Sequence, residues 1–143
     1  MEYRKFKLSD YESAIALWKV SDGVGLRGAD SLEGIEKYLK RNPGLSFVAE
    51  CDGEIIGTIM SGHDGKRGYV QHLAVSQRHQ NQGIGTHLIS LVLQALKSEG
   101  IVKSHIHVFA HNDQGKQFWL KRGWQYRTDL IVCSFINSND KNA

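Results

Sequence analysis

The sequence has few cysteines, no long apolar run and no cluster of basic residues, and each absence excludes a class of protein. The two cysteines, Cys51 and Cys133, are too few for a disulfide scaffold and lack Cys-x-x-Cys spacing, so they predict buried thiols in a cytosolic protein. Residues 1–6 contain no apolar core of signal-peptide length, and no later run approaches a membrane span. These absences predict a soluble, cytoplasmic protein without a membrane partner.

The charge of the chain is modest and evenly spread. Its 18 Lys and Arg residues outnumber its 15 Asp and Glu residues, which gives a net charge of +3. The basic residues form no tail or stripe of the kind found in nucleic-acid-binding proteins. We therefore expect no nucleic-acid partner. A length of 143 residues with 41% hydrophobic residues predicts one domain over residues 1–137, followed by a disordered polar tail at 138–143.

Apolar periodicity and turn residues predict an alternation of strands and helices. The Asp52-Gly53 pair is a strong hairpin signal, Ser9 with Glu12 forms a capping-box pattern, and Ser31 caps a helix that must end before Pro43. The expected strands are 3–8, 45–51, 54–61, 69–75, 103–109, 124–126 and 130–137, and the expected helices are 9–20, 31–42, 83–99 and 112–123.

The order of these elements predicts an α/β fold. The strands between residues 45 and 75 form an antiparallel meander, and the helix that follows returns the chain for a parallel strand. We expect a mixed central sheet flanked by helices.

The segment Gln80-Asn81-Gln82-Gly83-Ile84-Gly85-Thr86, between the strand ending at Val75 and a helix, predicts a phosphate-binding loop. Two glycines at a helix N-terminus leave backbone N–H groups accessible, and the helix dipole favours an anion there. The Lys of a nucleotide-triphosphatase loop and the third glycine of a dinucleotide-binding motif are both missing. The loop therefore favours neither of those two ligand classes.

The pattern Gln-x-x-Gly-x-Gly at Gln80–Gly85 resembles the pyrophosphate loop of the GNAT superfamily, whose members are acyl-CoA-dependent N-acyltransferases. A second segment, 112–124, resembles the family's Asn-x-x-Ala-x-x-Phe-Tyr-x-Lys-x-Gly-Phe pattern. It departs from that pattern at Gly115, Trp119 and Trp124. The two motifs stand in the family's order, and the resemblance extends over nearly the whole chain.

The resemblance implies a particular cofactor site. In GNAT folds the fourth and fifth strands splay apart, which here would open a wedge between Leu73–Val75 and His107–Phe109 for the pantetheine arm of acetyl-CoA. Main-chain groups would pair with that arm like an added strand. The implied cofactor-binding residues are Leu73, Ala74, Val75, Gln80, Asn81, Gln82, Gly83, Ile84, Gly85, Thr86 and Asn112.

The expected chemistry is attack of a primary amine on a thioester, which requires a base and a proton donor for the leaving thiolate. GNAT enzymes often use a tyrosine as the donor, at the position that is Trp119 here. An indole is not an acid near neutral pH, so Trp119 is interpreted as a packing residue. Tyr126 or Tyr69 would take the role, or the thiolate leaves unassisted.

His72 is the candidate base because imidazole titrates near neutrality. By strand alternation it faces away from Tyr69 and Gln71, unless a β-bulge intervenes. His107 and His111 have His-x-x-x-His spacing, but that segment runs from a strand end into a loop, so no metal site is predicted.

The acceptor is expected to be a small-molecule amine or a protein amine. The loop 21–30 should admit it, with Asp22 or Asp30 for a cationic amine and Arg27 for a carboxylate, unless the loop is simply solvated. A homodimer is left open. The alternative function, suggested by Trp119, is a noncatalytic module that binds acyl-CoA as a sensor.

Overall fold

The computed structural model describes residues 1–143 as two units, Met1–His107 and Val108–Ala143. The first unit holds the whole sheet and three helices, and the second holds one helix. The strands are β1 (Glu2–Lys5), β2 (Phe47–Cys51), β3 (Glu54–His63), β4 (Gly68–Val75) and β5 (Ser104–Ile106), and the helices are α1 (Tyr11–Lys19), α2 (Leu32–Arg41), α3 (Ile84–Ser98) and α4 (Asp113–Lys121).

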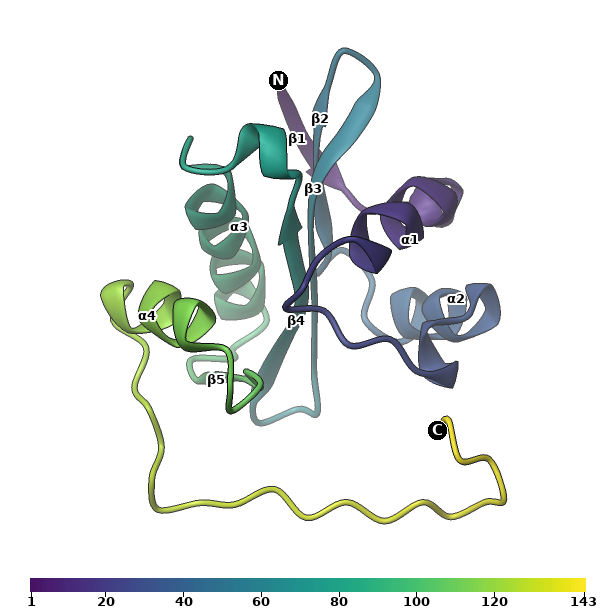
Figure 1. Cartoon of the computed structure of the whole chain (residues 1–143), viewed down its shortest axis with the longest axis vertical. Helices are drawn as coiled ribbons and strands as arrows, with labels where there is room; N and C mark the ends of the chain where they lie inside the picture. Colours follow the sequence, from purple (N-terminus) through teal and green to yellow (C-terminus); the bar gives the residue numbers. More distant parts are fainter. The chain divides into compact units, whose positions relative to one another are not determined.

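The sheet of the first unit is mixed, as the sequence predicts. Its strands lie in the order β1-β2-β3-β4-β5, with antiparallel pairing throughout except for the parallel pair β4 and β5. Figure 1 shows α3 on one side of this sheet and α1 and α2 on the other. Asp52 and Gly53 make the β2–β3 turn with positive φ angles of 52° and 78°, the conformation that favours this residue pair.

Two apolar clusters stabilise the first unit, one on each side of the sheet. The cluster that includes Trp18, Met60 and Ala74 joins α1 to β3 and β4, and the cluster of Leu45, Leu96 and Ile101 lies on the side of α3. Trp18 is 1% exposed. Its side chain is therefore part of the core.

The first helix begins later than its sequence pattern suggests. Instead of the Ser9–Glu12 box, residues Leu8–Asp10 form a 3-10 turn in which Asp10 Oδ2 accepts a hydrogen bond from Lys7 N at 2.9 Å. The carboxylate of Asp10 also accepts hydrogen bonds from the Nη1 and Nη2 atoms of Arg4, each at 2.9 Å. A two-point ion pair thus replaces the predicted cap.

The predicted strands 124–126 and 130–137 are not formed. Those residues have no strand partner and follow α4 without regular structure, with Ile131 at 87% and Phe135 at 89% exposed. A β-branched, apolar composition favours a strand only where a neighbouring strand supplies hydrogen bonds. The cysteine prediction is corrected as well, because Cys51 is only partly buried and Cys133 is exposed, both as free thiols.

None of the helices combines the length and the hydropathy that a membrane span requires.

Candidate functional site

The loop between β4 and α3 leaves the N-terminus of α3 open. Gly83 is the N-cap residue with φ of 80°, and no side chain caps the helix. Asn81 also has a positive φ, of 63°. Gln80 Nε2 donates a hydrogen bond back to the carbonyl of Val75 at 3.2 Å, which ties the loop to the end of β4.

The first amides of α3 have no acceptor within the helix, and the helix dipole adds partial positive charge at this point. A Cβ atom built on Gly83 would meet no protein atom within 4 Å. The space in front of the helix is therefore open to a ligand, and the arrangement suits a phosphate group.

The edge of β4 next to this loop has no strand beside it. Pairing with β5 covers only Gly68, Tyr69 and Val70, opposite Ser104, His105 and Ile106. Leu73, Ala74 and Val75 consequently have no strand partner on the β5 side, although the carbonyl of Val75 accepts the hydrogen bond from Gln80. This is the geometry in which an extended ligand can pair with a strand edge.

A β-bulge in β4 redirects His72. Thr58 pairs with Ala74 and Met60 with Gln71, so β4 has one residue more than β3 between these two pairs. His72 has φ of 52°, an unusual value for a residue other than glycine. The bulge brings His72 onto the face of the sheet that α1 covers.

Buried hydrogen bonds hold this bulge in place. The indole Nε1 of Trp18 donates to Thr58 Oγ1 at 2.9 Å, and Thr58 Oγ1 donates to the carbonyl of His72 at 2.9 Å. The His72 ring lies 4.6 Å from the ring of Trp18, centre to centre. Trp18 and Thr58 are residues that the sequence did not single out for the site, because only the register of β3 against β4 reveals their role.

Asp30 pairs with His72 across 42 residues of sequence. The atoms His72 Nε2 and Asp30 Oδ1 are 2.6 Å apart, and both side chains are largely buried. Burial alone would raise the pKa of Asp30, but the hydrogen bonds from His72 and from the backbone N–H of Arg27 lower it. An ionised carboxylate only accepts hydrogen bonds, so Nε2 carries the proton and Nδ1 is the nitrogen that can accept another.

The loop that precedes α2 holds Asp30 in place through further hydrogen bonds. Asp30 is the last residue of a 3-10 turn, Gly28–Asp30. The N–H of Arg27, the residue before this turn, donates a hydrogen bond to Asp30 Oδ2 at 2.9 Å. Tyr11 Oη donates to the carbonyl of Asp30 at 2.7 Å. Asp30 is held against His72, whereas Asp22 and Arg27 are exposed.

Of the two candidate acids, Tyr69 lies in the first unit. Its hydroxyl donates to Asp64 Oδ2 at 3.3 Å, and its ring lies 5.9 Å from that of His105. The negative charge of Asp64 raises the pKa of Tyr69. Tyr126 lies in the second unit, where Lys116 Nζ is 5.9 Å from the centre of its ring.

The second unit contains a capped helix and confirms the packing interpretation of Trp119. Asn112 Oδ1 accepts a hydrogen bond from Gly115 N at 2.9 Å, as the N-cap of α4. A Cβ atom built on Gly115 would lie 2.4 Å from Asn112 Nδ2, so the capping side chain lies directly against this glycine. Trp119 is 7% exposed and packs edge-on against Phe118 and Trp124.

Comparisons with known proteins agree with this geometry. Residues 11–124 match the family model described as the acetyltransferase (GNAT) family. An acetyltransferase of Pectobacterium atrosepticum is 37% identical over 113 residues, which is 79% of each chain. An acetyltransferase of Sodalis glossinidius is 36% identical over 132 residues, or 92% of each chain.

Solved structures share the fold. The PaiA N-acetyltransferase of Thermoplasma acidophilum, in complex with coenzyme A, superposes with a TM-score of 0.77 at 22% identity, over 88% of this chain and 90% of that chain. An aminoglycoside 6'-N-acetyltransferase of Acinetobacter haemolyticus superposes with a TM-score of 0.78 at 15% identity, over 96% of this chain and all of the other. At these identities the likeness concerns the fold.

Proposed function

Because the chain belongs to the GNAT family of acetyltransferases, we propose that it transfers an acetyl group from acetyl-CoA to a primary amine of an acceptor. The observation that carries this proposal is the open N-terminus of α3 next to the unpaired edge of β4. Gln80–Thr86 would hold the pyrophosphate, and the main chain of Leu73–Val75 would pair with the pantetheine arm. Asn112, matched by its motif, would contribute from the second unit.

His72 is the proposed base. An alkyl amine has a pKa of about 10, so its ammonium must lose a proton before it can attack. Nδ1 of His72 would take this proton, since Nε2 already donates to Asp30. The carboxylate of Asp30 fixes the tautomer and the ring orientation of His72, which makes Asp30 a positioning residue.

The transfer step balances with one proton donor. The amine nitrogen forms the amide bond to the acetyl carbon and loses its second proton, while the thioester C–S bond breaks and the sulfur leaves as a thiolate. The thiolate takes a proton from the donor, and the proton lost by the nitrogen restores the donor. Tyr69 is the proposed donor in the first unit, and Tyr126 is the alternative from the second. Acetyl-CoA supplies the acyl group, and this chain's residues orient the amine and move the two protons.

The cellular location proposed for this reaction is the cytoplasm, in agreement with two free cysteines.

A panel assay for CoA release tests the function. We expect the protein to release CoA from acetyl-CoA in the presence of some primary amines, and we expect His72→Gln to reduce that release strongly. Binding of acetyl-CoA without turnover by any amine would identify the sensor module instead. A folded protein that does not bind acetyl-CoA at all would contradict both functions.

A further inference from the structure

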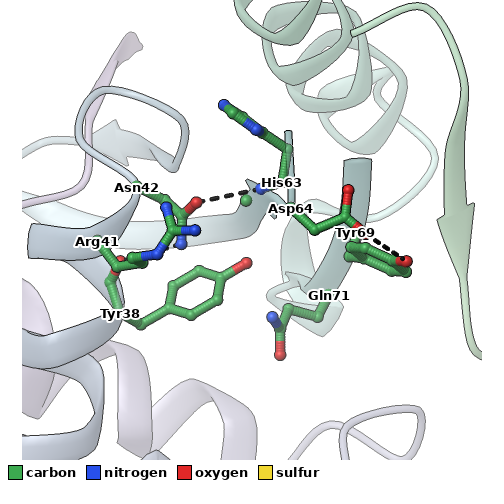
Figure 2. A pocket seen from close by; sticks show the side chains of 8 residues that line it. Tyr38, Arg41, Asn42, His63, Asp64, Tyr69 and Gln71 are labelled. Atoms are coloured by element: carbon green, nitrogen blue, oxygen red, sulfur yellow. Dashed lines mark hydrogen bonds between the residues drawn. The ribbon is translucent and has the colours of Figure 1, made fainter. Parts of the chain in front are cut away.

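An open pocket of about 320 Å³ lies beyond the bulge, between the end of α2 and the turn that joins β3 to β4. Its walls include Tyr38 and Arg41 from α2, Asp64 from the turn, and Tyr69 and Gln71 from β4. Figure 2 shows these side chains converging from the three elements. Gln71 is the neighbour of His72 in sequence, and the pocket therefore begins one residue from the proposed base.

A glycine makes room for the floor of this pocket. A Cβ atom on Gly62 would lie 2.7 Å from the hydroxyl of Tyr38 and 2.6 Å from Cγ of Asn42. Asn42 Oδ1 accepts a hydrogen bond from the N–H of His63 at 3.1 Å, which anchors the end of α2 to β3. Burial raises the pKa of Tyr38, so its phenol stays neutral and can hydrogen-bond a ligand.

The pocket presents one charge of each sign. Arg41 is exposed and makes no ion pair or hydrogen bond, so its guanidinium is available to an anion. Asp64 Oδ1 accepts the N–H groups of Lys66 and Arg67 at 2.8 Å each. Those hydrogen bonds lower the pKa of Asp64, and Oδ2, which accepts only from Tyr69, can accept a further donor.

The two charges come from different elements. In Figure 2 the side chains of Arg41 and Asp64 lie on opposite sides of the Tyr38 hydroxyl. A ligand with only a negative group would face the repulsion of Asp64, and a ligand with only a positive group would face that of Arg41. A group that carries both charges satisfies both side chains.

We propose that this pocket binds the zwitterionic head of a diamino acid, its carboxylate at Arg41 and its α-ammonium at Asp64, while the side-chain amine reaches His72 for acetylation. The inference rests on the proposed function, because it names the class of acceptor. The bulge supports it, because it places the consecutive residues Gln71 and His72 on the same face of the sheet. The product would be the amino acid acetylated on its side-chain amine, with CoA carrying a free thiol.

Four compounds on the same five-carbon chain separate the contributions of the two charges. Pentylamine has only the reacting amine, 6-aminohexanoate adds a carboxylate, cadaverine adds an ammonium, and lysine adds both. We would measure their dissociation constants by NMR titration of the protein saturated with CoA, with ornithine to test chain length. We expect lysine or ornithine to bind about ten-fold or more tightly than pentylamine, because each hydrogen bond to a charged group makes the free energy of binding more favourable.

Two variants assign the charges. Arg41→Gln should weaken lysine and 6-aminohexanoate about ten-fold and should weaken neither pentylamine nor cadaverine. Asp64→Asn, whose amide oxygen can still accept the turn N–H groups, should weaken lysine and cadaverine but not 6-aminohexanoate. Lys40→Gln removes a charge from the same helix outside the pocket, and it should change none of the constants.

Equal affinity for the four compounds, absence of binding by all of them, or an Arg41→Gln variant that binds lysine as the wild type does would each overturn the inference. Turnover is measured separately. Charge-dependent binding without CoA release from any amine would contradict the proposed function and leave the pocket assignment standing. CoA release from amines irrespective of their charge would support the proposed function and contradict the pocket assignment.

Discussion

At the scale of single residues, the site depends on a histidine whose direction is set by one inserted residue. Without the bulge, strand alternation would point His72 to the face that α3 covers, away from Asp30. With the bulge, Nε2 lies 2.6 Å from Asp30 and the ring packs on Trp18. A strained φ of 52° is maintained because buried hydrogen bonds from Trp18 and Thr58 fix it.

The pair of His72 and Asp30 should be visible in steady-state kinetics. We expect His72→Gln to lower kcat about 10²-fold or more, as for loss of a general base. Asp30→Asn should lower kcat less and leave the KM for acetyl-CoA unchanged, because the imidazole loses only the carboxylate that orients its ring. Steady-state kinetics with a responding amine measures both.

A purely structural role would give a different result. In that case Asp30→Asn would reduce the melting temperature and leave kcat unchanged. Asp22→Asn, on the same loop but exposed, serves as the control and should alter neither quantity.

The proton donor can be identified by comparing three aromatic substitutions. Trp119→Phe should keep most of kcat and lower the free energy of unfolding by about 0.5–3 kcal/mol, because the indole packs between Phe118 and Trp124. Tyr69→Phe or Tyr126→Phe should lower kcat. Asp64 raises the pKa of Tyr69, so a pH–rate profile limited by Tyr69 should fall only above pH about 10.

The same comparison exposes a wrong assignment. If Trp119→Phe alone is inactive while both tyrosine variants retain full kcat, the indole N–H takes part directly. If Tyr69 is the donor, Asp64→Asn should move the alkaline limb to lower pH, since the neighbouring charge that raises the pKa is gone.

At the scale of secondary-structure elements, local signals predicted most of the fold. Asp52-Gly53 makes a turn because both residues adopt positive φ, Ser31 caps α2 because its hydroxyl reaches the N–H of Gly34, and Gly83 opens α3. Each of these depends on a few consecutive residues. The sequence alone was therefore sufficient to predict these elements.

Contacts between distant segments could not be predicted from the sequence pattern. The bulge at His72 follows from the register of β4 against β3, and Asp30 meets His72 only because its loop folds back over the sheet. The segment 130–137 has the composition of a strand, but a strand also needs a neighbour, which composition does not supply. The strand prediction there was wrong for that reason.

The open N-terminus of α3 leads to a prediction with a control on the same helix. Gly83→Asn should weaken acetyl-CoA binding about ten-fold or more, because a side chain would occupy the space in front of the first amides. Asparagine tolerates positive φ better than other residues, so the fold should survive. Gly100→Asn, at the other end of α3 with φ of 82° and equally open surroundings, should leave binding unchanged.

Calorimetry on the two folded variants measures this difference. Equal acetyl-CoA affinity for Gly83→Asn and the wild type would contradict the assignment of the loop. Equal losses in both variants would show that strain in α3, and not the obstruction of phosphates, causes the effect.

At the scale of the whole molecule, an ion-paired cluster joins β1 to β2 and to the turn that precedes α1. Arg4 on β1 binds Asp10 through two hydrogen bonds and lies 3.4 Å from Glu50 Oε2 on β2. Asp10 is 7% exposed, so its charge depends on these partners. Burial acts to raise the pKa of Asp10, but the hydrogen bonds from Arg4 and from the N–H of Lys7 lower it.

Acid should therefore unfold the protein partly through Asp10. A carboxyl group whose pKa is lower in the folded state contributes stability above its unfolded pKa of about 3.9, and that contribution disappears as the pH falls through the folded value. Asp10→Asn should lower the free energy of unfolding by about 1–3 kcal/mol at pH 7. Urea denaturation across a pH series should show the two curves constant in separation above pH about 5 and converging below about 4. A separation that persists unchanged at pH about 3 would mean that Asp10 acts through its shape and not through its charge, because only the charge is lost by protonation.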